Sequence, residues 1–287
     1  MSGVDAPYDM LEPLEPGIAR LLAANPSPFT FTGTQSYVVG EAEVALIDPG
    51  PDLPDHVEAI IAALGGRRLV AIMCTHTHRD HSPAARPLAA ATGAPIIGCA
   101  ALSLASVGPR ADASFDGEYR PDRVLGDGEA IEVDGFALTA VATPGHTSNH
   151  LCFAYRGALF TGDHVMGWST SVVVPPDGDM GDYMASLDKL RARDDRIYYP
   201  AHGPAVTRPQ QLVRGMMGHR LQREGQILKR LREGDRTVAE IVAAAYPGLD
   251  PRLVGAAGGS VTAHLLDLER RALVVRGEGE SWTTASL

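Results

Sequence analysis

The chain has 287 residues, a length that fits one large domain or a core domain with a small appendage. Its 45% apolar and 21% charged residues are an ordinary globular composition, with enough apolar material for a substantial core. A formal net charge of −10 and an aromatic content of 6% disfavour a generally basic or base-stacking nucleic-acid-binding protein. Three cysteines at unrelated spacings, no apolar run of about 18 residues and no signal-like N-terminus favour a soluble, cytoplasmic protein.

The first part of the chain alternates between predicted strands and predicted helices. Strands are expected over residues 29–32, 36–39, 44–47, 69–74 and 95–98, and helices over residues 56–64 and 82–92. Ser82 suits the N-cap of the second helix and Pro83 its first position. This alternation predicts a parallel or mixed sheet that is covered by helices.

The middle of the chain is dominated by short strands joined by tight turns. Asp134 and Gly135 form a hairpin signal between two of these strands, and Arg156 and Gly157 join the next two. Strands are expected over residues 130–133, 136–141, 151–155, 158–161 and 196–199, and a helix over residues 182–190.

The pattern changes after about residue 207. Helices are expected over residues 209–233, 237–245 and 261–271, followed by strands over residues 271–276 and 281–284. Thr237 and Glu240 have the spacing of a capping box. Three helices and a hairpin predict a winged-helix-like unit, so we divide the chain into domains over residues 1–207 and 208–287.

The most informative segment is residues 75–81, which carry three imidazoles and a carboxylate directly after an apolar strand. His76 and His78 lie two residues apart, so on an extended segment they share a face and can reach one point. If the chain then turns, Asp80 and His81 can point to a second place nearby. Neutral imidazole suits zinc, and carboxylate oxygen suits a second ion, so the segment predicts metal binding.

Further candidates follow three later predicted strands. His146, Asp163 and His202 each come shortly after a strand, and each has a glycine as a neighbour in the sequence. A glycine lets the backbone approach a crowded centre closely. Their shared placement predicts that these three side chains join the histidine cluster.

With these motifs together, the sequence resembles the metallo-β-lactamase-fold hydrolases over about residues 15–207. The resemblance implies an α+β fold, an αββα sandwich, with the C-terminal winged-helix-like domain added to it. It also implies a bridging position for Asp163, where the true zinc β-lactamases typically carry cysteine, so antibiotic hydrolysis is not expected. In the family pattern, the ligands of the first metal are His76, His78 and His146. The ligands of the second metal are Asp80, His81 and His202.

The C-terminal part is similar to the β-lactamase-like-two branch of this family, whose animal member is a single-strand endoribonuclease. The similarity lies in residues 219–228, 237–242 and 264–269. We therefore expect a dinuclear zinc-dependent hydrolase, with iron or manganese as alternative metals, in which a metal-bridging hydroxide attacks the substrate. Asp80 is the predicted catalytic residue, because it can hold that hydroxide or take its proton. Asp48 and Thr147 are candidates for orienting the metal-bound imidazoles, whereas His150 and His164 are not expected to be ligands.

The sequence alone does not decide between several classes of substrate. Trp168 and Tyr183 are candidate pocket residues, and Arg220 and Arg223 belong to a basic stretch that could guide a phosphate backbone. That stretch, residues 208–236, carries eight Lys or Arg and three acidic residues. The alternatives are a phosphodiesterase or endoribonuclease acting on single-stranded RNA, a glyoxalase-II-like thioester or lactone hydrolase, a mononuclear iron sulfur dioxygenase, and a non-enzymatic metal-binding winged-helix regulator.

Overall fold

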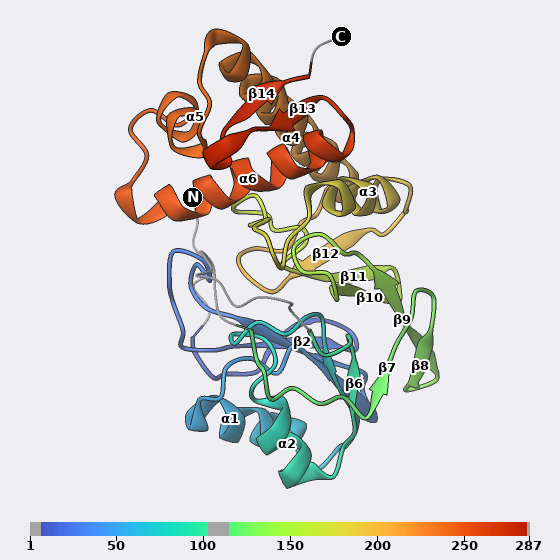
Figure 1. Ribbon diagram of the computed structural model, residues 1–287. Coiled ribbons are helices and arrows are strands. Elements are labelled where there is room, and N and C mark those ends of the chain that lie inside the picture. Colours follow the sequence, from blue (N-terminus) through green and yellow to red (C-terminus); the bar gives the residue numbers. More distant parts are fainter. Residues whose placement is uncertain (1–6, 103–114, 286–287) are drawn as a thin grey trace.

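The fold is two β-sheets packed face to face, with helices on their outer sides and a helical unit at one end (Figure 1). The computed structural model describes residues 7–102 and 115–285. The two layers of strands and their flanking helices form the αββα sandwich that the sequence predicts, and the C-terminal unit lies beyond helix α3 (Met180–Arg191).

The first sheet is mixed, as expected from the alternation of strands and helices. Within the described residues its seven strands follow one another in chain order, with antiparallel pairing up to β4 and parallel pairing from β4 to β7. Helices α1 (Pro54–Leu64) and α2 (Ala85–Thr92) cover its outer face. The strands are β1 Glu12–Glu15, β2 Ile18–Leu22, β3 Gln35–Val39, β4 Glu43–Ile47, β5 Arg68–Cys74, β6 Ile96–Gly98 and β7 Arg123–Val124.

The second sheet has the order β12-β11-β10-β9-β8 and is covered by α3. Asp134 and Gly135 both have positive φ, at 54° and 78°, as the tight turn between β8 and β9 requires. Only the pair β11 and β12 is parallel among these described strands. The strands are β8 Ala130–Val133, β9 Phe136–Ala142, β10 Leu151–Tyr155, β11 Ala158–Gly162 and β12 Ile197–Pro200.

The core between the two sheets brings the ends of several strands to the same edge. Tyr37 of the first sheet packs its ring 5.0 Å from that of Phe160 and 5.7 Å from that of Tyr199, both in the second sheet. All three side chains are buried, and apolar burial of this kind is the main force that holds the sheets together. The loops that follow β5, β9, β11 and β12 carry the candidate ligands.

The C-terminal unit has three helices and a hairpin, which confirms the winged-helix prediction. Its core includes Ile227, Leu265 and Trp282. Thr237 and Glu240 form the expected capping box at the start of α5. No helix in the described part of the chain is long and apolar enough to cross a membrane. The elements are α4 Pro209–Glu233, α5 Val238–Ala245, α6 Val254–Arg270, β13 Val274–Arg276 and β14 Trp282–Thr284, with short 3₁₀ turns at Pro251–Leu253 and Glu278–Glu280.

Two local predictions near the N-terminal half are wrong. Residues 29–32 form turns with a single bridge between Ser27 and Phe31, because the Ser27 hydroxyl accepts hydrogen bonds from the Thr30 backbone and side chain. The helix expected from residue 82 begins at Ala85 instead. Ser82 does not cap it, because its hydroxyl donates to Asp116.

Candidate metal centre

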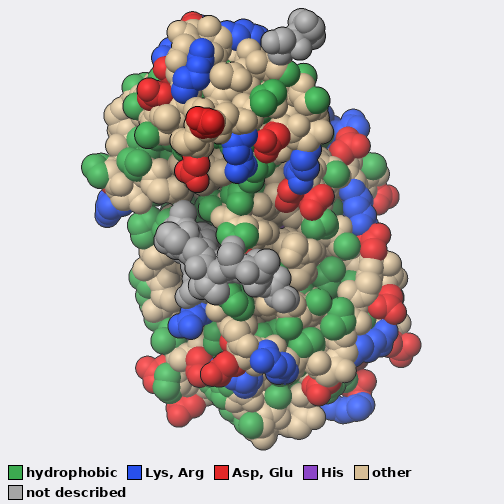
Figure 2. All heavy atoms as spheres, in the orientation of Figure 1, with side chains coloured by type: hydrophobic (Ala, Val, Ile, Leu, Met, Phe, Trp, Pro, Cys, Tyr) green, Lys and Arg blue, Asp and Glu red, His purple; other side chains and the backbone are tan. Residues whose placement is uncertain are grey.

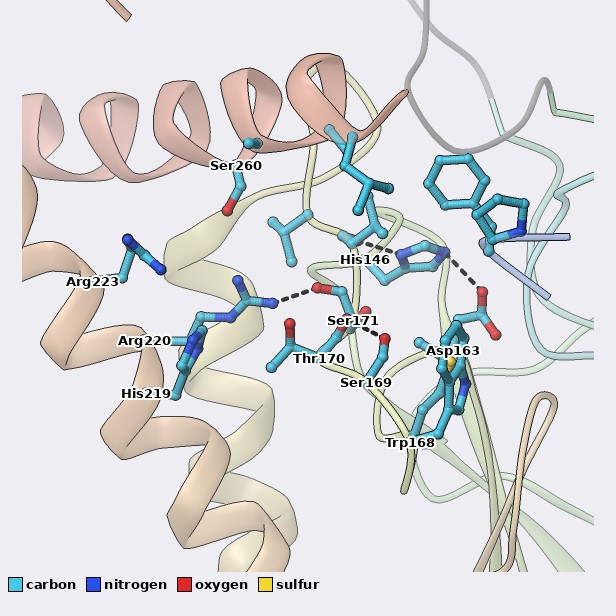
Figure 3. Close-up of a pocket in the computed structure, with 18 of the residues that line it drawn as sticks. His146, Asp163, Trp168, Ser169, Thr170, Ser171, His219, Arg220, Arg223 and Ser260 are labelled. Atoms are coloured by element: carbon cyan, nitrogen blue, oxygen red, sulfur yellow. Dashed lines mark hydrogen bonds and ion pairs between the residues drawn. The ribbon is translucent and has the colours of Figure 1, made fainter. Parts of the chain in front are cut away.

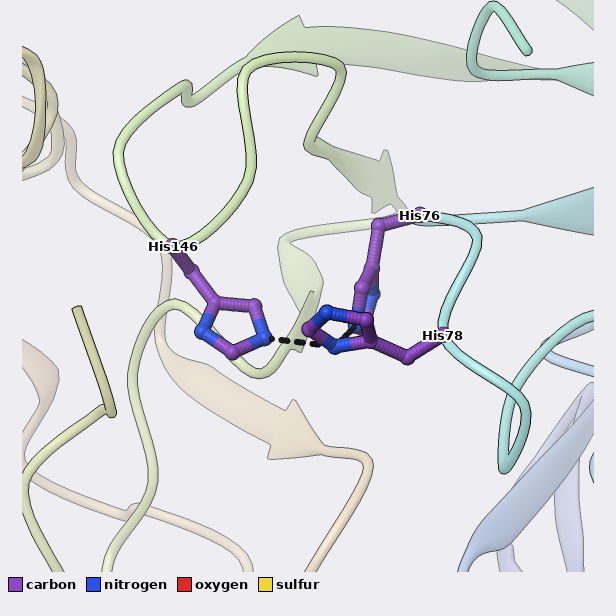
Figure 4. A group of neighbouring side chains, drawn as sticks. All are labelled: His76, His78 and His146. Carbon is purple, nitrogen blue, oxygen red and sulfur yellow. Dashed lines mark hydrogen bonds between the residues drawn. The ribbon is translucent and has the colours of Figure 1, made fainter. Parts of the chain in front are cut away.

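Three histidines from two loops bring ring nitrogens to one point (Figure 4). His76 and His78 follow β5, and His146 follows β9. Nδ1 of His78 lies 3.0 Å from Nε2 of His76 and 3.1 Å from Nε2 of His146. All three side chains are buried, so these nitrogens face one another away from bulk water. Three converging imidazoles can supply three of the four ligands of a tetrahedral zinc site.

A second group lies beside the first one. Nε2 of His202, in the loop after β12, is 3.2 Å from Oδ2 of Asp80. Nε2 of His81 is 3.4 Å from the same carboxylate oxygen. Asp80, His81 and His202 thus offer one carboxylate and two imidazoles to a second point.

Asp163, which follows β11, lies between the two groups. Its Oδ1 is 3.3 Å from Nε2 of His202 and 3.6 Å from Nε2 of His81. Its Oδ2 is 3.6 Å from Nε2 of His146, on the side of the first group. The two oxygens of one carboxylate therefore face different histidine groups, which is the arrangement of a ligand that bridges two ions.

The donor atoms fit a pair of divalent metal ions. Nε2 of His81 and Oδ1 of Asp163 are buried and have no hydrogen-bond partner. Buried polar atoms normally make hydrogen bonds, and this nitrogen and oxygen, which face each other at 3.6 Å, are placed so that both could bind one cation. Imidazole nitrogen with carboxylate oxygen suits zinc and also iron or manganese.

A buried carboxylate orients part of this cluster. Asp48, at the end of β4, places Oδ2 at 3.0 Å from Nδ1 of His81 and accepts hydrogen bonds from the backbone and hydroxyl of Thr75. The Thr75 hydroxyl lies 3.0 Å from Nδ1 of His76. These contacts support the expected orienting role of Asp48. The Thr147 hydroxyl donates to Asn149 instead.

Backbone carbonyls hold two further rings. Nδ1 of His146 lies 2.6 Å from the Val172 carbonyl oxygen, and Nδ1 of His202 lies 3.2 Å from that of Gly33. A carbonyl oxygen can only accept, so each Nδ1 carries a proton, and Nε2 is the nitrogen that can bind a metal once the ring is neutral.

When no metal is bound, burial and neighbouring charges shift the pKa values of the cluster's side chains in different directions. Burial, helped by the surrounding imidazoles, lowers the pKa of His76 well below its usual value. Burial alone would also lower the pKa of His81, but Asp80, Asp163 and Asp48 outweigh it and raise that pKa well above the usual value. Burial would raise the pKa of Asp80, yet His81 and His202 hold it well below the usual value.

Glycines next to the later candidates permit the close approach that the sequence suggests. Gly145 has φ +136°, and a Cβ atom there would lie 2.3 Å from Cα of Tyr183. Gly162 has φ +48°, and a Cβ would lie 2.7 Å from Oγ1 of Thr75. Any larger residue at either position would push apart the segments that carry the cluster.

Two cavities border the centre, and both include Phe29 and Asp163 in their walls. The first has a volume of about 360 Å³ and includes His146 and Asp163 in its wall, together with Trp168, Arg220 and Arg223 (Figure 3). The second has a volume of about 270 Å³ and is lined by Asn25, Ser27, Phe29, Thr30, His78, Arg79, Asp80 and Asp163.

Of the four predicted substrate-contact residues, Tyr183 is placed elsewhere. It is completely buried, its hydroxyl donates to the His164 carbonyl, and its ring lies 5.1 Å from the guanidinium carbon of Arg220. With no exposed atoms it cannot touch a substrate, so that prediction is wrong. Among the described residues, His150 and His164 belong to neither donor group.

Sequence reasoning missed two contributors to the site. Asp177 places Oδ2 at 3.6 Å from Nε2 of His78, and Phe29 borders both cavities. Asp177 lies in a Pro-Pro-Asp-Gly turn almost a hundred residues from His78, and no local pattern signals that contact. The two prolines only predict a turn.

The basic stretch does not form a continuous positive surface. Lys229 and Arg230 pair with Glu233, and Arg220 is buried. On the face seen in Figure 2, acidic and basic side chains are intermixed over the C-terminal unit.

Known proteins match the chain over both of its parts. The sequence profile of the metallo-beta-lactamase superfamily matches residues 29–202, and that of the beta-lactamase associated winged helix domain matches residues 237–282. An atrochrysone carboxyl ACP thioesterase from a Cryptosporiopsis species is 31% identical over 235 residues; the match covers 79% of this chain and 66% of that protein, just under two thirds of its length.

Two more relatives extend this comparison. A beta-lactamase-like protein 2 homolog from Caenorhabditis elegans is 32% identical over 231 residues, which cover 78% of this chain and 74% of that protein. The crystal structure of a beta-lactamase domain protein from Burkholderia ambifaria superimposes with a TM-score of 0.80 at 18% identity, over 98% of this chain and 96% of that one. At that identity the structural likeness concerns the fold alone.

Proposed function

The chain belongs to the metallo-beta-lactamase superfamily, and from this premise we propose that it is a metal-dependent hydrolase that acts on thioesters. The observation that carries the proposal is the position of Asp163, whose two carboxylate oxygens face the two histidine groups. A bridging carboxylate between two donor sets is what a two-ion hydrolytic centre requires.

We assign the seven side chains as ligands of two ions, with zinc as the proposed metal. Asp163 would contact both ions through its two oxygens. When bound, such ions supply an activated water at neutral pH and polarise the oxygen of the substrate. The first ion would be held by His76, His78 and His146, and the second by Asp80, His81 and His202.

In the proposed reaction a water oxygen adds to the thioester carbonyl carbon, the carbon–sulfur bond breaks, and a carboxylic acid and a thiol are released. Asp80 holds the attacking water and takes its proton. Its carboxylate is held by His81 and His202 and lines the smaller cavity, so it is ionised and reachable. The thiolate that leaves then takes the proton that Asp80 received and becomes the thiol, which returns Asp80 to its ionised form.

The shape of the larger cavity supports a small acyl substrate over a polynucleotide. A volume of about 360 Å³ is within the range of small-molecule sites, and its wall includes Met166, Val173, Leu249 and Leu253. The relative from Cryptosporiopsis is named a thioesterase, which agrees with this choice. The pairing of Lys229 and Arg230 weighs against the endoribonuclease alternative, which needs unpaired cations along a strand path.

We also propose that residues 1–207 form the catalytic domain and residues 208–287 an accessory domain. Helix α4 of the accessory domain contributes Arg220 and Arg223 to the cavity wall. In this arrangement the winged-helix unit shapes the substrate site, and it does not act as a separate metal-binding regulator.

The test is a turnover panel with the zinc-loaded full chain. It compares acyl thioesters of N-acetylcysteamine, S-lactoylglutathione, homoserine lactone, bis-p-nitrophenyl phosphate and single-stranded RNA. We expect thioester hydrolysis that Asp80→Ala abolishes and that Asp188→Ala, at an exposed position on α3, leaves intact. RNA cleavage that depends on Asp80, without thioester turnover, would overturn the proposal in favour of a phosphodiesterase.

A further inference from the structure

We infer that the larger cavity selects substrates that carry an anionic group, which Arg220 and Arg223 bind at the end remote from the metal centre. The inference rests on the proposed function, because it assumes that the reacting carbonyl lies at the other end, beside His146 and Asp163. The two arginines thereby specify a negative charge on the substrate, and the fold and the metal ligands do not specify this charge.

Arg220 is a buried cation without an anionic partner. Only 4% of the residue is exposed, and it lies in the wall of the cavity. It donates to the Ser171 carbonyl and lies over the Tyr183 ring, but its Nε has no hydrogen-bond partner. In the described part of the chain no carboxylate forms an ion pair with it. A buried charge of this kind is costly unless a partner compensates it, and a bound anion would be that partner.

Arg223 stands one turn further along the same face of α4. Its Nη1 donates to the Ala245 carbonyl and to Gln226, and its guanidinium carbon lies 3.8 Å from the centre of the Tyr246 ring. Its Nε is also buried without a hydrogen-bond partner, and the described residues offer it no carboxylate. Residues three apart on a helix are neighbours, so two unpaired guanidinium groups face the same space.

The cavity has different chemistry at its two ends. Figure 3 shows Arg220 and Arg223 projecting from α4 on one side, and His146 and Asp163 on the other, with the loop that carries Ser171 between them. Ser171 is buried and its hydroxyl has no hydrogen-bond partner, so it can donate to a ligand in the same space. Trp168 supplies an aromatic wall near the metal centre.

This polarity fits a ligand with an apolar middle and an anionic oxygen group, because guanidinium groups bind carboxylates and phosphates with charge-assisted hydrogen bonds. The anion can belong to the acyl part, as a carboxylate, or to the thiol part, as the phosphate of a phosphopantetheine arm. Both sources present the same chemistry to the two arginines, and matched substrates separate them.

The kinetic test uses pairs of thioesters that differ in one charge. The first pair is the 4-carboxybenzoyl and 4-carbamoylbenzoyl thioesters of N-acetylcysteamine, and the second is benzoyl phosphopantetheine and benzoyl pantetheine. We expect the zinc-loaded chain to show a KM about tenfold lower for the charged member of one pair, which identifies the source of the anion. Arg223→Gln and Arg220→Met should bring that ratio towards one.

Two further variants separate charge recognition from a structural role. Arg220→Lys keeps the charge, so part of the preference should return relative to Arg220→Met. Arg232→Gln removes a charge from an exposed position on the same helix, outside the cavity, and should keep the wild-type ratio. A charge preference that survives both Arg223→Gln and Arg220→Met, or its absence from both pairs in the wild type, would overturn the inference.

A binding measurement makes the inference independent of turnover. In the Trp282→Phe background Trp168 is the remaining tryptophan, so its fluorescence reports on the cavity. We expect 2-phenylethanesulfonate, a poor metal ligand, to bind about tenfold more tightly than the neutral methyl 2-phenylethyl sulfone, and Arg223→Gln to remove the difference. Arginine-dependent sulfonate binding without thioester turnover would sink the proposed function and keep the anion site. Thioester turnover with no sulfonate binding and no charge preference would overturn the anion site and keep the proposed function.

Discussion

Oδ2 of Asp48 lies 3.0 Å from Nδ1 of His81, and this contact turns Nε2 of the same ring toward Asp163. Asp48 is buried and adopts a positive φ of 49°, a conformation that aspartate tolerates better than most residues. It also fixes Thr75, whose hydroxyl contacts His76, so one carboxylate orients rings in both donor groups.

Replacing this carboxylate should weaken metal binding without removing a ligand. We expect Asp48→Ala to lower the zinc affinity of the second site by about tenfold to a hundredfold, which is the usual effect of losing such an outer contact. Competition with a chromophoric chelator measures this affinity. Asp127→Ala, at a surface ion pair with Lys189, is the matched control and should bind zinc as the wild type does. Equal affinities in the two variants would contradict the orienting role.

The backbone at Gly145 should be intolerant of any side chain. A Cβ atom there would lie within 2.4 Å of the Tyr183 backbone nitrogen, so Gly145→Ala must separate the His146 loop from α3. We expect a large loss of thermal stability and of first-site zinc binding, measured by calorimetry and metal content. Gly234→Ala is the control: Gly234 also has a large positive φ, +115° against +136° at Gly145, but a Cβ there meets nothing within 4 Å, so it should show the smaller cost of backbone strain alone. Similar losses in both variants would argue against the steric account.

The two halves of the centre should differ in how zinc binding depends on pH. The pKa of His76 is lowered by burial, so this ligand is already neutral near pH 7. The pKa values of His81 and His202 are raised: burial would lower both, but the neighbouring carboxylates outweigh it. Zinc binds neutral imidazole, so the second ion must release protons and its affinity should rise with pH. Titration calorimetry in buffers of different ionisation enthalpy counts these protons, and equal proton release at both sites would contradict the assignment.

The same raised pKa values predict how the metal-free fold responds to pH. A group whose pKa is higher in the folded state stabilises the fold below its unfolded pKa, about 6.5 for histidine, and the benefit is lost as pH rises through the folded value. The metal-free chain should therefore lose stability in alkaline solution, and bound zinc should reduce this loss. Histidines whose pKa is lowered by burial, such as His76, add stability as pH rises only until the unfolded chain is deprotonated as well, just above 6.5. Thermal melts from pH 8 upward, with and without zinc, therefore isolate the effect, and a metal-free melting temperature that rises over that range would contradict it.

The capping box of α5 should contribute measurably to the accessory domain. Thr237→Ala removes the hydroxyl that accepts from the Glu240 backbone, and we expect it to cost about 1 kcal/mol of unfolding free energy. Trp282 lies in the core of the same unit, so its fluorescence follows unfolding in urea. Thr207→Ala, at an exposed position before α4, is the control, and a cost equal to that of Thr237→Ala would contradict the capping role.

Local sequence patterns predicted much of this architecture. The hairpin through Asp134 and Gly135 and the long helix α4 lie where turn chemistry and apolar periodicity indicated. The shared placement of His146, Asp163 and His202 after strands also predicted that they would meet the first cluster, and in the structure they lie beside it. Their role as ligands remains a prediction.

Contacts made between distant segments could not be predicted in the same way. Ser82 has the sequence of an N-cap, yet Asp116 takes its hydroxyl, and no local signal reveals that partner. Tyr183 has a reasonable position for a pocket residue in the sequence, but helix packing buries it beneath Arg220. In both cases tertiary contacts override a local preference.

The central claim is that the seven side chains hold two ions that share Asp163. The most direct measurement is anomalous scattering at the zinc edge from crystals of the zinc-loaded chain. We predict one peak among His76, His78 and His146, and a second among Asp80, His81 and His202, with Asp163 within bonding distance of both. A single peak, or peaks away from these residues, would contradict the account.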